Sequence, residues 1–509
     1  MLRRASVLLG FAILLTTVAC FVEKIPGRYC NTKDDCTEPG YTKCDTRANT
    51  CVSDSVDTDL GTGGDDMTVI GCTTSSTCPA TEPVCSPAQV CSSCGATGMS
   101  TECNTYHSST PFCGSSGGCV ECLTKDNCDL VHKTCSSMNA CVPCVDNGDC
   151  TSGVCTAGVC ADKATLLYVN NAQAAGCSDA GPGSFAMPFC TVQKGLNAGA
   201  AAAKPVVVFS GTYAENLQAN NTLNAGNDYV VTVTGVGNPV VKPSSSGAAL
   251  AVVGATPKQV TVSFDGFTFD GSTLADGSDG IDCNGGGTPA YGKTLVTITR
   301  STVKGASGIG LLAQAKCTVT LDADIFVGDK GGAIKTDTCD LAFTNLLLHD
   351  NGTAGTAAGS TFGGILFSAA GEAGKTSMFN MTVVNNVAAT TAGASGILCL
   401  AAPTAVTNTV VLGNQGPTTE ISAACGASFS AFIGGAGSNN ENIPVTGCGV
   451  ADLLVDPAHG DYHVKKNGTK PCTLQDQGTN TNAPNHDLEG TSRPQPASGT
   501  DDIGCYEAK

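Results

Sequence analysis

One arginine and a group of aspartates are the residues in the second half of the chain best suited to acid–base chemistry. Arg300 is the one arginine between residues 165 and 450, and several aspartates lie in the Gly-rich stretch before it. A basic side chain can remove a proton next to a carboxylate when a bound calcium ion makes that proton more acidic. The alternative is that these aspartates cap backbone amides at turns. The catalytic candidates are Arg300, Asp279 and Asp282, and the calcium candidates are Asp265, Asp270 and Asp276.

The chain contains 31 cysteines, and those in its first third follow a repeated spacing. Two units have the spacing C-x5-C-x6-C-x5-C, and three more are variants of it. Each unit holds four cysteines, enough for two disulfide bridges. The regular units are Cys72, Cys78, Cys85, Cys91 and Cys122, Cys128, Cys135, Cys141. The variants are Cys94, Cys103, Cys113, Cys119, then Cys144, Cys150, Cys155, Cys160, and, first in the chain, Cys30, Cys36, Cys44, Cys51.

These units contain too few aliphatic residues to fold around an apolar core, so covalent cross-links must replace one. We therefore predict disulfide bridges within each unit. The alternative is zinc, since Cys91 and Cys94 have the C-x2-C spacing of zinc ligands. In an exported chain this spacing favours disulfides. The units resemble small cysteine-rich repeats of secreted bacterial proteins and of Dickkopf-type modules, and this resemblance implies a spacer or an interaction module.

The N-terminus predicts export. Arg3 and Arg4 precede an apolar run, Ala5 to Leu15, which has the length of a signal peptide and is too short to span a bilayer. Residues 17–20 resemble a bacterial lipobox, with Thr17 in place of the usual leucine. This resemblance implies cleavage after residue 19 and lipidation of Cys20. The alternative is an ordinary signal peptide that leaves Cys20 as a spare thiol.

Two further observations support the lipid anchor. Without Cys20, the number of cysteines is even, so that every remaining one can pair. Phe21, the next residue, lacks the acidic character associated with retention at an inner membrane. We therefore expect an exported protein that is lipid-anchored in the membrane, at the outer membrane or the cell surface.

Charge limits the possible partners. The net charge is −18, from 26 basic and 44 acidic residues, and the pI is near 4.6. A surface that binds phosphates needs clustered lysines and arginines, so we expect no nucleic acid partner. The remaining partners are neutral or cationic, such as a polysaccharide or a cell-surface protein. Residues 52–71 form an acidic, flexible linker, for which calcium binding is the alternative.

From residue 165 onward, short β-branched runs are separated by Gly, Asn, Asp and Ser, which predicts many short strands. Shorter signals, such as Gly308 to Leu311, alternate with these runs, as is typical of a solenoid with two or three strands per turn. A β-sandwich is the alternative, but its hairpins would show closer turn signals. The runs include 206–209, 229–233, 260–264, 295–299, 319–321, 341–348, 378–384 and 406–412. The asparagines expected at left-handed turns are Asn345, Asn380, Asn385, Asn386, Asn408 and Asn414.

Two parts of this region resemble known families. Segments 167–170, 178–183, 188–196 and 206–216 together resemble the first coils of pectate-lyase-like β-helices. Segments 460–464, 487–494 and 502–507 are similar to the choice-of-anchor Q ending of many bacterial β-helices. These resemblances imply a mostly β fold, namely a right-handed parallel β-helix (solenoid) preceded by small disulfide-rich repeats. The expected domains are a lipoprotein signal peptide (1–19), the lipid-anchored N-terminus with the first cysteine unit (20–51), the acidic linker (52–71), the cysteine-rich repeats (72–164), the β-helix (165–450) and the choice-of-anchor Q-like segment (451–509).

The remaining cysteines suggest two bridges in this half of the chain. Cys177 and Cys190 are close in sequence and lie on either side of one turn. Cys505 stands where the choice-of-anchor Q pattern usually has alanine. Together with Cys472, it implies a bridge that closes the C-terminal end.

The fold leaves the function open, because pectate-lyase-like helices include lyases, hydrolases, esterases and inert surface proteins. The Gly-His-Gly turn of galacturonan hydrolases and the Arg-Pro-Trp segment of pectin esterases are absent from the sequence, which contains no tryptophan. We therefore expect a surface-displayed lipoprotein with a structural, adhesive or glycan-binding role and no catalysis. The alternative is a calcium-assisted polysaccharide lyase, with calcium the one cofactor considered. An enzyme should gather Arg300 or a lysine with two or more carboxylates in a groove on one sheet, whereas a structural protein should disperse them on turns.

Overall fold

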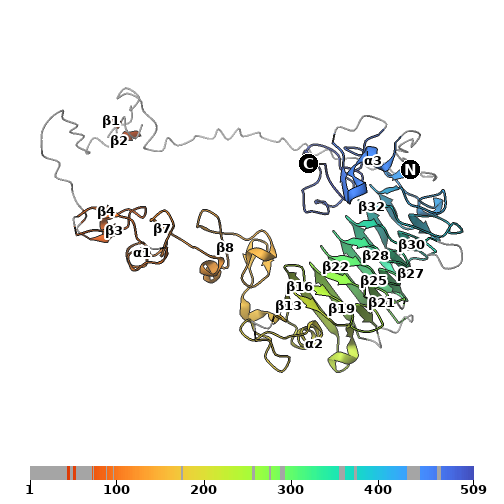
Figure 1. The fold of residues 1–509 in the computed structure, drawn as a ribbon, viewed down its shortest axis with the longest axis horizontal. Helices are drawn as coiled ribbons and strands as arrows, with labels where there is room; N and C mark the ends of the chain where they lie inside the picture. The colour runs from red at the N-terminus through yellow and green to blue at the C-terminus, as the bar shows by residue number, and fades with distance from the viewer. Residues whose placement is uncertain are drawn as a thin grey trace, which may run out of the picture. The chain divides into compact units, whose positions relative to one another are not determined.

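The structure is a computed structural model, which falls into two units, residues 1–71 and residues 72–509 (Figure 1). It describes residues 43–45, 50–52, 72, 74–87, 89–95, 97–172, 176–254, 258–273, 277–286, 293–354, 361–371, 375–432, 448–466 and 472–508. The predicted signal peptide, the predicted lipidation site Cys20, nearly all of the predicted acidic linker and the calcium candidate Asp276 lie outside the described residues.

Each cysteine unit ends in a small antiparallel hairpin. In the first unit of the chain, β1 (Lys43–Asp45) pairs with β2 (Thr50–Val52), which places Cys44 opposite Cys51. The third and fourth cysteines face each other in the same way in the other four units. The hairpin strands are β3 (Val84–Cys85) with β4 (Cys91–Ser92), β6 (Phe112–Cys113) with β7 (Cys119–Val120), β8 (Thr134–Cys135) with β9 (Cys141–Val142), and β10 (Cys155–Thr156) with β11 (Val159–Cys160). The other elements of the units are η2 (Ser75–Thr77), β5 (Gly98–Met99), α1 (Thr101–Tyr106), η3 (Lys125–Val131) and η4 (Asn147–Asp149).

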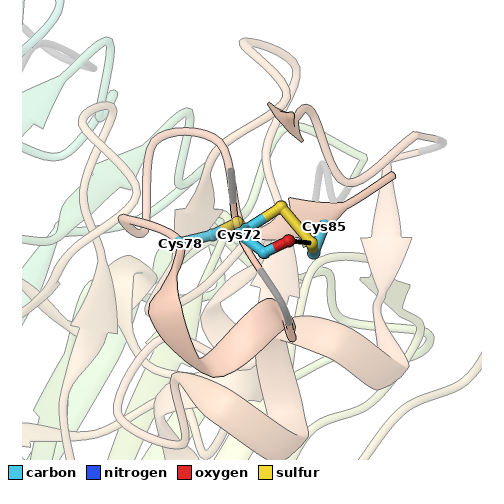
Figure 2. A group of neighbouring side chains, drawn as sticks. All are labelled: Cys72, Cys78 and Cys85. Carbon is cyan, nitrogen blue, oxygen red and sulfur yellow. Dashed lines mark hydrogen bonds between the residues drawn. A yellow bond between two sulfur atoms is a disulfide. The ribbon is translucent and has the colours of Figure 1, made fainter. Parts of the chain in front are cut away.

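Disulfide bridges form within the four described units and follow one pattern, first cysteine to third and second to fourth. The two bridges of a unit lie against each other, since the sulfur atoms of Cys72, Cys78 and Cys85 are within 4.8 Å of one another (Figure 2). Sulfur atoms joined in a disulfide are not thiolates, so the zinc alternative is wrong for these units. The pairs are Cys72–Cys85, Cys78–Cys91, Cys94–Cys113, Cys103–Cys119, Cys122–Cys135, Cys128–Cys141, Cys144–Cys155 and Cys150–Cys160.

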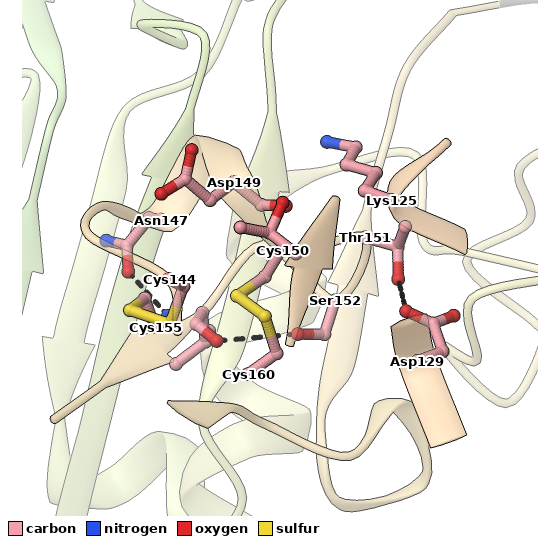
Figure 3. The surroundings of a disulfide bond; sticks show 12 residues. Lys125, Asp129, Cys144, Asn147, Asp149, Cys150, Thr151, Ser152, Cys155 and Cys160 are labelled. Carbon is pink, nitrogen blue, oxygen red and sulfur yellow. Dashed lines mark hydrogen bonds between the residues drawn. A yellow bond between two sulfur atoms is a disulfide. The ribbon is translucent and has the colours of Figure 1, made fainter. Parts of the chain in front are cut away.

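The last two disulfide units are joined by hydrogen bonds. The backbone N–H of Cys160 donates to the carbonyl of His132 at 2.9 Å, and the Thr151 hydroxyl donates to the Asp129 carboxylate (Figure 3). The last unit also packs on the first coils of the main body, because Val154 packs against the apolar cluster that contains Val207. A Cβ at Gly153 would lie 2.8 Å from the Val207 side chain, so this contact requires a glycine.

The main body is a parallel β-helix of three sheets, through which the chain passes in the order sheet 1, sheet 2, sheet 3 (Figure 1). Each strand pairs in parallel with its counterpart on the next coil, which confirms the predicted solenoid. Sheet 1 comprises β12 (Leu167–Val169), β13 (Val206–Phe209), β16 (Tyr229–Val236), β19 (Val260–Asp265), β22 (Thr294–Thr299), β25 (Cys317–Asp322), β28 (Asp340–Thr344), β31 (Thr376–Phe379) and β34 (Ala405–Thr407). Sheet 2 comprises β14 (Thr212–Tyr213), β17 (Val240–Val241), β20 (Thr268–Asp270), β23 (Thr302–Lys304), β26 (Ile325–Val327), β29 (Leu347–His349), β32 (Thr382–Val384), β35 (Val410–Leu412) and β36 (Ala431–Phe432). Sheet 3 comprises β15 (Leu217–Asn220), β18 (Leu250–Val253), β21 (Ile281–Asn284), β24 (Leu311–Gln314), β27 (Ile334–Asp337), β30 (Ile365–Phe367) and β33 (Ile397–Cys399).

The core lies inside the coils and comes from every second residue of the longer strands. In β22, Thr294, Val296 and Ile298 are buried while the residues between them are partly exposed. β-Branched side chains suit these positions because they pack well on a pleated surface. The resulting apolar cluster runs without interruption from the first strand of sheet 1 to the last strand of sheet 2.

Three of the predicted runs each form two strands separated by a corner. The run 341–348 contains β28 and β29, with Asn345 at φ +53° between them. Asn380 and Asn408 occupy the equivalent corners on later coils, at φ +50° and +52°. The prediction of left-handed asparagines is therefore confirmed at these three positions and at Asn385, and it is wrong for Asn386 and Asn414. The prediction of a single strand is wrong for each of the three runs.

The first coils are closed by α2 (Val192–Ala202), which buries Val192 and Leu196 against the core. The Thr191 hydroxyl caps this helix by accepting a hydrogen bond from Lys194 N. The predicted bridge between Cys177 and Cys190 is present beside it. Short 3-10 turns lie at η5 (Lys163–Thr165), η7 (Asn221–Asn224) and η8 (Ala423–Cys425).

The C-terminal segment covers the last coils. It includes α3 (Val450–Leu453), β37 (Leu454–Asp456), η9 (Pro457–His459) and β38 (Asp461–Val464). Arg493 forms an ion pair of 2.8 Å with Glu507, and neither side chain has any exposed area. Arg493 Nη2 also donates to the carbonyl of Gly504 at 2.8 Å. The Asp487 carboxylate accepts hydrogen bonds from Thr491 N and Glu507 N, at 2.7 and 3.1 Å.

The predicted bridge between Cys472 and Cys505 is wrong. Cys472 pairs with Cys448, with their Cα atoms 5.6 Å apart. Cys505 is a free, fully buried thiol, and its backbone N–H donates to the Thr382 hydroxyl at 3.0 Å. That hydrogen bond fixes Cys505 against sheet 2, where its side chain fills an apolar space rather than reaching another sulfur atom. Cys339 is the second free cysteine among the described residues, and it is also buried.

Among the described residues, no helix combines the length and the apolar character needed to cross a membrane.

Candidate functional site

Arg300 stands at the corner between sheets 1 and 2. On successive coils this corner is occupied by Gly266, Arg300, Ala323 and Asn345, all with positive φ. Arg300 has a φ of +48°, a conformation that costs an ordinary L-residue roughly 1–2 kcal/mol. The turn conformation therefore does not favour arginine at this position, whereas it does favour the glycine and the asparagine at the same corner of other coils.

The Arg300 guanidinium pairs with Asp265 on the preceding coil. Its Nη2 lies 2.5 Å from Asp265 Oδ2, and the arginine side chain is 64% exposed. Asp265 also accepts hydrogen bonds from Thr299 Oγ1 at 2.9 Å and from Asn147 Nδ2 at 3.1 Å. Asn147 belongs to the last disulfide unit, so this unit and the β-helix enclose a cleft of about 310 Å³ with Arg300 in its wall.

A second cleft, of about 590 Å³, lies on the other side of Arg300. Its walls come from the corner between sheets 1 and 2, including Asp322, and from the C-terminal segment, including His486, Glu489 and Tyr506. Two segments far apart in the chain thus border the same corner and leave Arg300 between them. We call the two clefts together the corner groove.

His486 attaches the C-terminal segment to the corner. Its Nε2 lies 3.0 Å from Asp322 Oδ2, and its Nδ1 lies 2.9 Å from Asn485 Oδ1. The hydrogen bond with Asp322 raises the pKa of His486 above 6.5. Burial tends to raise the pKa of Asp322, but hydrogen bonds from His486 and Thr344 hold it below 3.8. Both ring nitrogens face acceptor oxygens, so the protonated imidazolium satisfies both contacts and retains no lone pair for a general base.

A second histidine, His463, contacts residues of the same wall. His463 Nε2 is 3.3 Å from Glu489 Oε1, and His463 Nδ1 is 2.6 Å from Asp461 Oδ1. The His463 ring stacks on Tyr506, with ring centroids 4.0 Å apart. His463 therefore lies between two carboxylates, those of Glu489 and Asp461.

The catalytic candidates Asp279 and Asp282 lie elsewhere. Asp282 is in β21 of sheet 3 and Asp279 lies just before it, whereas Arg300 is at the corner between sheets 1 and 2. Burial raises the pKa of both aspartates, and the charge of Asp279 adds to the rise at Asp282. Asp279 Oδ1 accepts a hydrogen bond of 2.7 Å from Ile309 N, and the charge of Lys335 acts in the opposite direction on its pKa. The structure thus brings the two aspartates together but does not bring Arg300 to them.

The two described calcium candidates form ion pairs with different cations. Asp265 pairs with Arg300, and Asp270 Oδ2 lies 3.4 Å from Lys304 Nζ. Asp270 also accepts a hydrogen bond from Ser272 N at 3.0 Å. In the described part of the chain, the groups of three or more residues with metal-ligand spacing consist of disulfide-bonded cysteines. Asp265 and Asp270 therefore do not share one cation site.

Three residues of the corner groove were not predicted as site residues from the sequence, namely His486, Glu489 and Tyr506. All three lie in or beside the motif segments 487–494 and 502–507, which indicated architecture only. More than 160 residues separate Asp322 from His486, so no local spacing could reveal their contact. The one available signal was Arg300 itself, the single arginine of the β-helix.

Comparison with protein-family models and with curated proteins finds no match to this chain.

Proposed function

We propose that this chain is an exported surface lipoprotein that presents its β-helix for adhesion or glycan binding and does not catalyse a reaction. The observation that carries the proposal is the extent of disulfide bonding. Among the described residues, 24 cysteines form twelve bridges and two are free. Disulfides at this density persist in oxidising spaces outside the cytoplasm.

The series of disulfide units supports display. Cross-linked units keep their shape without a large core, and the last of them is packed onto the β-helix, so together they would act as a spacer. The attachment point of that spacer would be Cys20, in the lipobox-like segment.

The distribution of charge supports binding without turnover. Arg300, Lys304 and His486 each pair with a different aspartate, as expected of charges that stabilise corners rather than gather around a reacting bond. One observation favours the alternative, a polysaccharide lyase. Asp279 and Asp282 are neighbours with raised pKa values, and Asp282 Oδ1 has no hydrogen-bond partner among the described residues.

We also propose that the main body is a pectate-lyase-like β-helix with a choice-of-anchor Q-like ending. Hydrogen bonds and an ion pair within that ending support this assignment. Asp487, Arg493 and Glu507 are motif positions, and they contact one another in a buried network. A motif that specifies such a network is expected to keep these residue types wherever it closes a β-helix.

Cell fractionation with lipid labelling tests the anchor and the display together. In cells that produce the whole chain, the wild type should incorporate labelled fatty acid and should be degraded when intact cells are treated with protease. Cys20→Ser should lose the label and leave the membrane fraction. Cys505→Ala, which changes a buried thiol away from the anchor, should behave like the wild type. A Cys20→Ser variant that stays with the membrane to the wild-type extent would refute the anchor.

A further inference from the structure

Two covers leave one stretch of the corner between sheets 1 and 2 open. The C-terminal segment covers the later coils, where Asn380 Nδ2 donates to the carbonyl of Asp502 and Asn408 Nδ2 to that of Thr479. The last disulfide unit reaches the earlier coils through Asn147 and Asp265. Between the covers lies the corner groove, with Arg300 in the wall of both clefts.

The groove runs along the axis of the β-helix. Gly235, Gly266, Arg300 and Ala323 follow one another along the same corner, on consecutive coils of sheet 1. Coils of this kind are about 4.8 Å apart, so these four residues span roughly 14 Å. Arg300 has the one long side chain among the four. The groove therefore has small residues around a single projecting guanidinium.

Charges of both signs line the groove. Arg300 contacts Asp265 and His486 contacts Asp322, while Asp146 and Glu489 add two further carboxylates. An acidic ligand would meet these carboxylates and also the net charge of −18. A cationic ligand would lie against the projecting guanidinium of Arg300. The presence of both signs in one groove therefore favours an uncharged ligand.

Uncharged sugars fit this arrangement. A hydroxyl group both donates and accepts, so it can accept from an exposed N–H of the Arg300 guanidinium and donate to a nearby carboxylate. The walls also offer apolar surface from Ile325 and Leu488, against which the C–H face of a sugar can pack. Alternating polar groups with apolar walls are the usual composition of a small-molecule site.

We infer that the corner groove binds an uncharged polysaccharide, with Arg300 as its central hydrogen-bond donor. The inference rests on the proposed binding role and adds to it the site and the ligand class. The binding residues are Arg300, Glu489 and Asp322, and Asp265 orients the guanidinium.

Native affinity electrophoresis tests the inference on the purified chain. The gels contain dextran, galactomannan or arabinoxylan as neutral probes, polygalacturonate as the acidic probe, and chitosan as the cationic probe. The informative variant is Arg300→Asn, because asparagine already occupies the equivalent corners at Asn345, Asn380 and Asn408 and keeps the turn intact. Lys304→Ala is the matched control, since it removes a cation paired with Asp270 outside the groove.

At least one neutral polysaccharide should retard the wild type. Arg300→Asn should weaken that binding roughly tenfold or more, as the loss of a charged hydrogen-bond donor does. Glu489→Gln, on the opposite wall, should weaken it as well, and Lys304→Ala should leave it unchanged. Equal urea midpoints for the wild type and Arg300→Asn show that the fold is intact.

Three results would overturn the inference: no retardation by any neutral polysaccharide, retardation that Arg300→Asn does not change, or retardation by polygalacturonate or chitosan alone. Surface display is measured separately on intact cells. A chain that reaches the cell surface and ignores all three neutral polysaccharides would therefore refute this site while leaving the display proposal standing.

Discussion

The side-chain oxygen of Asn351 accepts a hydrogen bond of 3.0 Å from the backbone N–H of Asp329, on the preceding coil. This contact is one step of a ladder along the corner between sheets 2 and 3. Asn386 accepts in the same way from Asn351 N, and Asn414 from Asn386 N, at 3.1 and 3.0 Å. Asp329 continues the ladder by accepting from Ala306 N at 2.8 Å. An aspartate thus occupies a position that the later coils give to asparagine.

The difference leaves one oxygen atom without a partner. The three asparagines donate from Nδ2 to a strand carbonyl of the preceding coil, at 2.9 to 3.0 Å. Asp329 has a carboxylate oxygen instead of this amide, and among the described residues that oxygen is buried without a hydrogen-bond partner. Burial raises the pKa of Asp329 from 3.8 to about 8. The folded protein therefore retains a proton that the unfolded chain releases near pH 4.

We predict that Asp329→Asn stabilises the β-helix and reduces the pH dependence of its stability. Because the pKa is raised in the folded state, the free energy of unfolding falls as pH rises from about 4 to about 8, with a slope of up to roughly 1.4 kcal/mol per pH unit. The amide donates at every pH without taking up a proton, so the variant avoids the cost of protonating Asp329, up to roughly 4 kcal/mol near pH 7. Urea unfolding of the wild type and the variant at pH 5, 6, 7 and 8 measures both effects.

Two variants serve as controls for this prediction. Asp337→Asn removes an exposed carboxylate of β27 and should leave the pH profile unchanged. Asn351→Asp places a second carboxyl group in the ladder and should steepen the loss of stability above pH 6. An Asp329→Asn variant as pH-dependent as the wild type would show that this carboxyl group does not control the profile.

The free thiols give a second prediction. Cys339 and Cys505 have no exposed area, and burial raises the pKa of each thiol to about 12. Both thiols should resist a maleimide reagent in the native protein. Under non-reducing conditions they should react only once the protein is denatured. Peptide mapping should then recover Cys448 linked to Cys472. A peptide that links Cys472 to Cys505 would contradict the structure.

Single cysteine substitutions should distinguish a free buried thiol from a disulfide-bonded cysteine. Cys505→Ala should change stability only slightly, because alanine leaves a small space in the C-terminal core. Cys448→Ala should destabilise the segment by about 3 kcal/mol, since it opens a loop of more than 20 residues. Urea midpoints under non-reducing conditions provide the comparison. An equal loss in both variants would argue against the observed pairing.

The buried ion pair gives a third prediction. Arg493→Met should destabilise the C-terminal segment by roughly 3–5 kcal/mol, because it leaves Glu507 buried without its cation. The double variant Arg493→Met with Glu507→Gln should recover part of that loss. Limited proteolysis and urea unfolding report on the segment. If both variants lost the same stability, the charge of Glu507 would not be the cause.

Much of the fold follows from the sequence because its signals are local. The run 206–209 is β13, and the bridge from Cys177 to Cys190 closes over one turn. Residue type predicted the left-handed corners at Asn345, Asn380 and Asn408, since asparagine tolerates positive φ. Repeated spacing predicted bridges within the cysteine units, although the order first to third and second to fourth needed the structure.

The corner groove could not be predicted, because it depends on contacts between distant segments. Arg300 meets Asp265 from the preceding coil and lies between Asn147 and His486, far away in the chain. Among the aspartates named as candidates, Asp265 lies beside Arg300, whereas Asp279 and Asp282 do not. The register of the coils decides this, since it places those two on sheet 3. The predicted bridge between Cys472 and Cys505 was also wrong, because Cys472 pairs with Cys448.

The most direct test of the proposed function is a turnover assay on the purified chain with neutral and acidic polysaccharides, with and without calcium. It follows the absorbance of unsaturated products and the release of reducing ends. We predict no turnover under any of these conditions, together with binding of a neutral polysaccharide that Arg300→Asn weakens. Calcium-dependent turnover that disappears in Asp282→Ala would contradict the proposal and identify the chain as a lyase.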